Sequence, residues 1–158
     1  MATTSGPRVR PYVPLDRRAV VALWSACELL RPWNDPDRDI ERKLSHDGDG
    51  LLVLELDGRV VGSVMVGYEG HRGWVNYLAV DPARRGEGLG TLLMAEAERR
   101  LAQMGCPKVN LQVRAENGEV LAFYRRLGYL PDEVVSMGKR LVDEAGGSPA
   151  SHRAGGSG

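Results

Sequence analysis

Glycines at alternate positions mark the stretch of the chain whose residue types are best suited to bind a ligand. Residues 84–91 read Arg-Arg-Gly-Glu-Gly-Leu-Gly-Thr and stand between a predicted strand and a predicted helix. Because glycine has no Cβ, backbone N–H groups in such a turn can converge on one point. The helix behind the turn adds unpaired N–H groups and the positive end of its dipole. The turn therefore predicts a cradle for a phosphate or pyrophosphate, with Arg84 or Arg85 as a cation at its rim.

Two other kinds of phosphate loop do not fit these residues. An ATP-type loop requires a lysine directly after its last glycine, and none stands there. A dinucleotide-binding loop requires glycine three residues after Gly88, where Thr91 stands, and it belongs between parallel strands. The strand before this turn instead ends an antiparallel series. A plain flexible loop is the remaining structural alternative.

Three predicted strands lead up to the glycine turn. Asp57-Gly58 between two apolar runs is typical of a two-residue hairpin turn, so residues 51–56 and 59–68 are predicted to pair antiparallel. Residues 74–80 form the third strand. A long helix then runs to about Met104. The apolar residues expected on its buried face are Leu89, Leu92, Leu93, Ala97, Leu101 and Met104.

The N-terminal part of the chain predicts one strand and two helices. A short strand at 9–13 precedes a helix that Asp16 caps and that ends before Pro32. After a stiff loop, Asp35 caps a second helix, which Pro36 opens and which runs toward His46. The residues expected on the buried stripe of this second helix are Ile40 and Leu44.

The C-terminal part predicts a strand at 108–114, a helix at 117–127 that Gly128 stops, and a final strand at 134–141. The complete order of elements predicts an α/β fold in which helices flank a mixed, mostly antiparallel central sheet. We expect one domain over residues 8–142, with flexible termini at 1–7 and 143–158.

Composition excludes several classes of function. The 158 residues contain 21 Lys and Arg and 21 Asp and Glu, so the basic excess of a nucleic-acid-binding domain is absent. No apolar run is long enough to span a membrane, and the N-terminus lacks the apolar stretch of a secretory signal. Two cysteines, Cys27 and Cys106, form neither a disulfide framework nor a metal-ligand pair. These features predict a cytoplasmic protein that contacts neither membrane nor nucleic acid.

Two motifs in order resemble the GNAT acetyltransferases. The first is Arg85-x-x-Gly88-x-Gly90, directly behind the predicted strand at 74–80. The second runs from Asn117 to Tyr129 as Asn-x-x-Val-x-x-Phe-Tyr-x-x-x-Gly-Tyr, with valine where the family usually has alanine. The stretches LLRPWNDPDRDIERK, GYEGHRG and MGCPK are similar to those of the YpeA-type bacterial acetyltransferases.

This resemblance implies a GNAT fold and transfer of acetyl from acetyl-CoA to a primary amine in a ternary complex. In that family the fourth strand carries a bulge and parts from the fifth, and its backbone pairs with the pantetheine arm. The resemblance assigns cofactor binding to two groups of residues and to a helix start, namely Leu78, Ala79 and Val80, then Arg85, Gly86, Glu87, Gly88, Leu89, Gly90 and Thr91, and finally Asn117. It places Tyr124 beside the thioester sulfur. A protonated tyrosine there can donate a proton to the leaving thiolate.

The acceptor side is expected at the loop between the first two helices, at Trp33, Asn34 and Asp35. A protein N-terminus, a lysine side chain and a small amine all fit. No general base is assigned, because the strand at 74–80 contains no carboxylate. Dimers are common in the family that the chain resembles, but no interface is visible in the sequence.

The same residues have plainer interpretations. Asn117 is also a good helix cap, Tyr124 is also a core tyrosine, and Asp35 is also an ordinary cap. His46 near two aspartates indicates a helix end, so no metal is expected. A non-catalytic acetyl-CoA-binding sensor or interaction module is the alternative to an enzyme.

Overall fold

Five strands form one sheet in the order β1-β2-β3-β4-β5. The computed structural model describes residues 5–144, so most of the predicted flexible termini at 1–7 and 143–158 lie outside the described residues. The strands are β1 (Arg8–Pro11), β2 (Leu51–Leu56), β3 (Arg59–Tyr68), β4 (Gly73–Val80) and β5 (Val109–Leu111). The first four pair antiparallel, and β4 pairs with β5 in parallel. The predicted mixed, mostly antiparallel sheet is confirmed.

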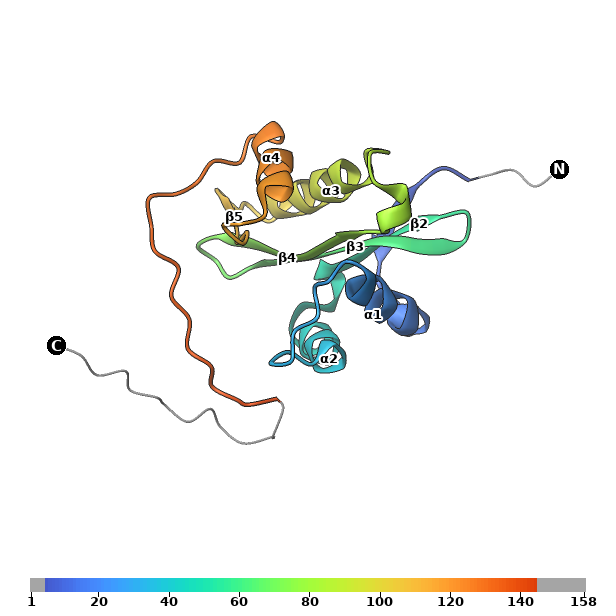
Figure 1. Cartoon of the computed structure of the whole chain (residues 1–158), viewed down its shortest axis with the longest axis horizontal. Helices are drawn as coiled ribbons and strands as arrows, with labels where there is room; N and C mark the ends of the chain where they lie inside the picture. The colour runs from blue at the N-terminus through green and yellow to red at the C-terminus, as the bar shows by residue number, and fades with distance from the viewer. Residues whose placement is uncertain (1–4, 145–158) are drawn as a thin grey trace.

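Two layers of helices cover the two faces of this sheet (Figure 1). The helices α1 (Arg17–Ala26) and α2 (Pro36–Asp47) lie on one face. The helices α3 (Leu89–Gln103) and α4 (Gly118–Arg126) lie on the other. Consecutive β2 residues alternate between the two hydrophobic clusters, with Leu51 and Val53 toward α1 and Leu52 and Leu54 toward α3. This interior strand is therefore apolar on both faces, because both are covered.

The turn at Asp57-Gly58 has the geometry that the sequence predicts. Both residues have positive φ, +52° for Asp57 and +75° for Gly58, as a type I′ hairpin turn requires. The register of β2 and β3 follows from this turn, with Leu56 opposite Arg59.

Helix α1 ends earlier than predicted, at Ala26 instead of just before Pro32. Glu28 adopts the left-handed conformation with φ +58° and reverses the chain. Its N–H donates to Ser25 O at 3.0 Å, and the N–H of Leu29 donates to Trp24 O at 2.9 Å. This is the Schellman ending, with glutamate in the position that glycine usually takes.

Three predictions of helix packing are corrected. In α3, Leu92 and Met104 are exposed, and Met94 is buried in their place. In α2, Leu44 is exposed, whereas Lys43 is buried with its Nζ donating to Val66 O at 2.6 Å. The third concerns Asp16, whose carboxylate makes no capping hydrogen bond to α1. It accepts from the guanidinium of Arg10 and from the N–H of Val13.

The predicted strand at 134–141 is wrong. This segment is extended but pairs with no strand among the described residues, and it runs away from the sheet past β5 (Figure 1). Its apolar side chains are among the most exposed in the protein, at 91% for Met137 and 86% for Val135. Arg140 near the end of the segment donates to Trp33 O, and Glu144 just beyond it accepts from the N–H of Asp35, so the chain leaves the sheet edge for the α1–α2 loop. The predicted strand at 108–114 shrinks to β5, because no strand within residues 5–144 pairs with its outer edge.

Candidate functional site

The edge of β4 is open over the second half of the strand. Pairing with β5 covers only Gly73–Val75, opposite Val109–Leu111. On its other edge β4 stays paired with β3 as far as Val80. Along residues 76–80, the backbone groups on this edge of β4 are therefore not paired with any described strand. An extended ligand can add to such an edge as a further strand does.

A bulge at Tyr77–Leu78 decides which backbone groups face that open edge. The register of β3 and β4 shifts between Ser63 and Met65, so two β4 residues lie opposite one on β3. The N–H of Gly73 donates toward β5, whereas that of Asp81 donates to Val61 on β3. In a regular strand, residues eight apart would point the same way. The extra residue reverses the pattern, so Leu78 and Val80 turn their N–H groups outward.

Tyr77 is held firmly at this bulge. It has φ +51°, which is rare for a residue with a side chain. Its ring stacks on the indole of Trp24 with centroids 3.8 Å apart, and its carbonyl accepts from Ser63 Oγ at 2.9 Å. The indole N–H of Trp24 donates to the same Ser63 Oγ at 2.9 Å. Trp24 and Ser63 are both fully buried.

The glycine turn that follows β4 leaves its backbone donors available. Gly86 and Gly88 have φ of +82° and +76°, and a Cβ on either would meet only open space. Within residues 5–144, the N–H groups of residues 85–88 donate to no backbone or side-chain acceptor. The first N–H groups of α3, from Leu89 to Thr91, have no partner inside the helix. An anion the size of a phosphate fits this donor set.

The charged residues of the turn lie at its surface. Arg85 and Glu87 are exposed, and Glu87 pairs with Arg84 at 3.8 Å. The side chain of Leu89 is buried in the α3 cluster, so only its backbone can face a ligand. Of the two arginines suggested for the rim, Arg85 is thus the one without an ion pair among the described residues.

Close packing at Gly90 fixes α4 beside the turn. A Cβ on Gly90 would lie 3.1 Å from the ring of Phe123. The next residue, Tyr124, is 8% exposed and touches Phe123 and Tyr129 edge-on. Burial raises the pKa of Tyr124 to about 12. Its hydroxyl therefore stays protonated over the whole working range of pH and can donate a proton or a hydrogen bond.

An open cavity of about 1290 Å³ connects this tyrosine with β4. Its lining includes Asn76 on β4, Tyr124 on α4 and the outer edge of β5, but no residue of the glycine turn. Asn117 lies outside it, and its Oδ1 accepts from the N–H of Val120 at 3.3 Å. The interpretation of Asn117 as a helix cap is confirmed.

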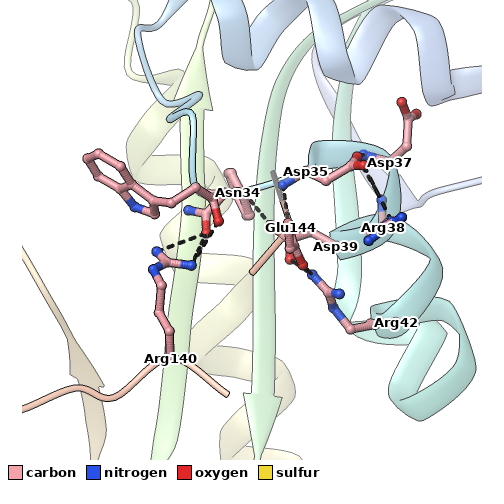
Figure 2. A network of polar contacts seen from close by, with 10 residues as sticks. Asn34, Asp35, Asp37, Arg38, Asp39, Arg42, Arg140 and Glu144 are labelled. Carbon is pink, nitrogen blue, oxygen red and sulfur yellow. Dashed lines mark hydrogen bonds and ion pairs between the residues drawn. The ribbon is translucent and has the colours of Figure 1, made fainter. Parts of the chain in front are cut away.

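The α1–α2 loop meets the end of the described chain (Figure 2). Arg140 donates to Trp33 O at 2.8 Å and lies 5.7 Å above the centroid of the Trp33 ring. It also reaches Asn34 Oδ1 at 3.4 Å. Glu144 accepts from the N–H of Asp35 and from Arg42. The three loop residues expected on the acceptor side are thus grouped, with Trp33 44% exposed.

Asp35 and Asp39 have different roles at the start of α2. The carboxylate of Asp35 caps the helix by accepting from Asp37 N and Arg38 N, as predicted. Asp39 points instead to the sheet, where its Oδ2 accepts from the hydroxyl of Tyr77 at 2.5 Å. Sequence reasoning missed Asp39. Helical spacing contains the signal, because Asp39 shares a face with Ile40 and Lys43, the two buried residues of α2.

Metal and membrane sites are not found in the part of the chain that the structure describes. Residues 5–144 contain no group of three or more His, Cys, Asp or Glu arranged to hold a metal ion. Among the same residues, no helix has the length and apolar character needed to cross a membrane.

Comparison with known proteins identifies the family. Residues 18–129 match the acetyltransferase (GNAT) family. A protein named as an acetyltransferase from Pectobacterium atrosepticum is 50% identical over 136 residues, covering 86% of this chain and 96% of that protein. A similarly named protein from Sodalis glossinidius is 51% identical over 137 residues, with the same coverage of both chains. The chain belongs to the GNAT acetyltransferase family and is an acetyl-CoA-dependent acyltransferase.

Solved structures agree on the fold. Ard1 from Thermoplasma volcanium superposes with a TM-score of 0.70 at 22% identity, covering 80% of this chain and 84% of that one. The aminoglycoside acetyltransferase AAC(6')-Iy, solved with a bisubstrate analogue that contains CoA, gives a TM-score of 0.71 at 20% identity. That match covers 86% of this chain and 99% of the other.

Proposed function

We propose that this protein is an N-acetyltransferase that transfers acetyl from acetyl-CoA to a primary amine by direct attack within a ternary complex. The observation that carries the proposal is the open edge of β4, which runs from the free donors of the glycine turn toward the cavity at Tyr124. Acetyl-CoA has a pyrophosphate at one end of an extended arm and a thioester at the other. The site offers a matching feature for each part.

The binding residues follow from this match. The pyrophosphate is bound by backbone N–H groups, those of Gly86, Gly88, Leu89, Gly90 and Thr91. Arg85 is exposed and adds a positive charge, and Glu87 is exposed beside it on the same turn. The backbone of Leu78 and Val80, with Ala79 between them, pairs with the pantetheine arm. Asn117 keeps its Oδ1 on the helix, so it contacts the arm through its amide nitrogen.

Catalysis then needs little more than position and one proton donor. Holding amine and thioester together makes the attack effectively unimolecular. The nitrogen forms a bond to the thioester carbon, the carbon–sulfur bond breaks, and the sulfur leaves as a thiolate. Tyr124, which burial keeps protonated even above the ordinary tyrosine pKa, donates a proton to that sulfur.

The acceptor enters beside Trp33, Asn34 and Asp35 in this proposal. Trp33 offers an exposed aromatic face, and Asp35 adds negative charge that attracts an ammonium group. A protein N-terminus, a lysine side chain and a small amine such as an aminoglycoside are the classes to compare. Solved relatives in this fold include aminoglycoside acetyltransferases.

The proposal is tested by ligand-induced stabilisation and then by turnover. A ligand at 100 times its Kd adds about 2.7 kcal/mol of stability. For a domain of this size, Tm should rise by about 5–10 °C with acetyl-CoA and with CoA but stay unchanged with NAD and ATP. Thiol release from acetyl-CoA is then followed with four acceptors, which are spermidine, a tetrapeptide with a free N-terminus, Nα-acetyl-lysine and an aminoglycoside.

Two outcomes would contradict the proposal. A Tm rise with NAD or ATP but not with CoA would mean that the glycine turn binds another ligand. Stabilisation by acetyl-CoA without amine-dependent thiol release from any of the four acceptors would favour a cofactor-binding module over an N-acetyltransferase.

A further inference from the structure

One carboxylate reaches the bulge of β4 from outside the strand. Asp39 belongs to α2, yet its Oδ2 accepts from the hydroxyl of Tyr77 at 2.5 Å. The strand itself contains no carboxylate. The contact thus supplies to β4 the type of group that its own sequence lacks.

The place of this contact matters. Tyr77 stands where β4 has parted from β5 and where the bulge turns Leu78 and Val80 toward the open edge. Its ring packs with the α1 side of the sheet, whereas Tyr124 packs with the α3 side. The two tyrosines therefore approach β4 from opposite faces. Tyr124 is proposed to protonate the leaving thiolate from the α3 side. Tyr77 lies on the opposite side, where the α1–α2 loop is proposed to bind the acceptor.

We propose that Tyr77 and Asp39 form a proton relay that accepts the proton an acceptor ammonium must lose before it attacks. This inference rests on the proposed function, because it concerns the same amine. Tyr77 is the group closer to the acceptor, and Asp39 is the final proton acceptor.

The charges around the pair fit this division of roles. Arg42 donates to Asp39 Oδ1 at 2.7 Å and holds the carboxylate with Oδ2 toward Tyr77. Glu144 from the end of the described chain contacts the same Arg42. Burial, with the neighbouring carboxylates of Asp39 and Glu144, raises the pKa of Tyr77 well above its ordinary value. The Tyr77 hydroxyl is therefore protonated before the reaction. It can accept a proton from the ammonium only if its own proton moves to Asp39 at the same time.

Two proton transfers occur together at the pair. An N–H proton of the ammonium moves to Tyr77 Oη while the Tyr77 proton moves to Asp39 Oδ2. The products are a neutral amine, an unchanged tyrosine and a protonated Asp39, which later releases its proton to solvent. The amine nitrogen then bonds to the thioester carbon and the carbon–sulfur bond breaks. The thiolate gains a proton from Tyr124, the second nitrogen proton passes to solvent, and solvent returns one proton to Tyr124. The only net release is therefore the proton that Asp39 passes to solvent, one per acetyl transferred.

Rigid geometry makes the pair suitable for this role. The stack on Trp24 and the bond from Ser63 fix the ring and backbone of Tyr77. The side chain of Asp39 is 24% exposed, which is enough for exchange of a proton with solvent. A group already in position contributes to catalysis without a reorganisation at the moment of reaction.

The test compares Asp39→Asn and Tyr77→Phe with the wild-type protein, using the fastest of the four acceptors above. Glu41→Gln is the matched control, because Glu41 lies on the same helix but pairs with Arg17 and is 65% exposed. We expect kcat at pH 7 to fall about 100-fold or more in Asp39→Asn and in Tyr77→Phe. The Kd for CoA should stay unchanged in both, and Glu41→Gln should behave as wild type.

The dependence on pH separates a proton relay from a structural role. Without the relay only amine that is already neutral reacts, so the rate of Asp39→Asn should rise about tenfold per pH unit toward the pKa of the acceptor, which is about 10 for a lysine side chain and about 8 for a peptide N-terminus. The deficit relative to wild type therefore shrinks between pH 7 and pH 9.5. A deficit that is the same at every pH, or no deficit, would overturn the relay. Tyr77→Phe keeps the stacked ring, so it gives the same answer if Asp39→Asn folds poorly.

Failure of the relay is distinguishable from failure of the proposed function. Wild-type protein that releases thiol with an amine, together with variants that match it, overturns the relay alone. Wild-type protein that binds CoA but turns over no amine overturns both.

Discussion

The indole of Trp24 on α1 and the ring of Tyr77 on β4 lie nearly parallel, with an angle of 11° between their planes and 3.8 Å between their centroids. The hydroxyl of Ser63 links the two residues, because it accepts a hydrogen bond from the Trp24 indole and donates one to the Tyr77 carbonyl. Two residues from two other elements thus fix Tyr77, the one residue of β4 that has a left-handed backbone. The bulge is built into the core and is not a local irregularity.

This arrangement predicts a specific loss of stability in Ser63→Ala. The variant leaves the indole N–H and the Tyr77 carbonyl without their partner in a buried place, which costs about 1–3 kcal/mol of unfolding free energy. Ser45→Ala, on the exposed face of α2, should change stability by less than about 0.5 kcal/mol. Urea denaturation measures both values. Equal stability of the two variants would mean that water replaces the Ser63 hydroxyl.

Gly88→Ala tests the glycine turn against a control with the same backbone. Gly88 and Gly58 have φ of +76° and +75°, and neither would place a Cβ near another atom. Both alanine variants should therefore lose about 1–2 kcal/mol of stability from backbone strain alone. Only Gly88→Ala should also weaken CoA binding, by about tenfold, the equivalent of one lost hydrogen bond to a charged group. Titration calorimetry decides, and equal CoA affinity in both would remove the pyrophosphate from this turn.

Tyr124→Phe should lower kcat by about 100-fold while leaving the KM for acetyl-CoA nearly unchanged, since the ring still fills its place in the core. Because the pKa of Tyr124 is about 12, its ionisation causes no fall in wild-type rate below about pH 11. Tyr68→Phe is the control, as its hydroxyl donates to Gly70 O in the β3–β4 turn, away from Tyr124. Steady-state kinetics with unchanged kcat in Tyr124→Phe would exclude the tyrosine as the proton donor.

Two loop variants test the acceptor side without disturbing the fold. Asparagine caps helices as well as aspartate does, so Asp35→Asn removes the charge and keeps the cap. We expect Asp35→Asn and Trp33→Ala each to raise the KM for the acceptor several-fold and to leave the Kd for CoA unchanged. Leu15→Ala, at a position that is 95% exposed on the 3-10 turn before α1, provides the control. Unchanged constants in both loop variants would place the acceptor elsewhere.

Asp16 predicts how stability depends on pH. Two hydrogen bonds from Arg10, at 2.8 and 3.0 Å, together with the N–H of Val13, lower the pKa of this buried carboxyl. Its contribution is therefore fully present above the unfolded pKa of about 3.9 and is lost as pH falls through the lower folded value. Asp16→Asn should lose about 2–3 kcal/mol at pH 7. The difference from wild type should shrink below about pH 4.

The matched control for this pH dependence is Asp132→Asn. Asp132 forms an exposed pair with Lys108, so its removal should cost less than about 1 kcal/mol at any pH. Thermal unfolding between pH 3 and pH 7 measures both curves. A constant gap between Asp16→Asn and wild type across this range would show that the Asp16 pKa is not lowered.

Local chemistry made part of this structure predictable. The turn at Asp57-Gly58, the cap at Asp35 and the glycine turn before α3 each depend on residues within a few positions of one another. Their backbone requirements are therefore visible in the sequence. The parting of β4 from β5 and the bulge were implied only by the family resemblance, and the register of the sheet confirms them.

The rest depends on contacts between distant segments. Asp39 reaches Tyr77 across 38 positions, and no spacing rule connects a helix residue with a bulge on a strand. Lys43 is buried because Val66 O accepts from it, which makes a charged residue part of the inner face of α2. Residues 134–141 have strand-like composition, but polar contacts of Arg140 draw them away from the sheet. In each case tertiary contacts override local pattern.

The contacts of Arg140 with Trp33 and Asn34 also bear on how such a protein can diverge. Arg140 is exposed and lies outside both hydrophobic clusters, so its replacement changes the α1–α2 loop at little cost to folding. The glycine turn depends on the positive φ of Gly86 and Gly88, and the β4 bulge is packed against Trp24, so neither has such freedom. Substitutions at Arg140 can therefore change what the α1–α2 loop contacts, while the glycine turn and the β4 bulge stay the same.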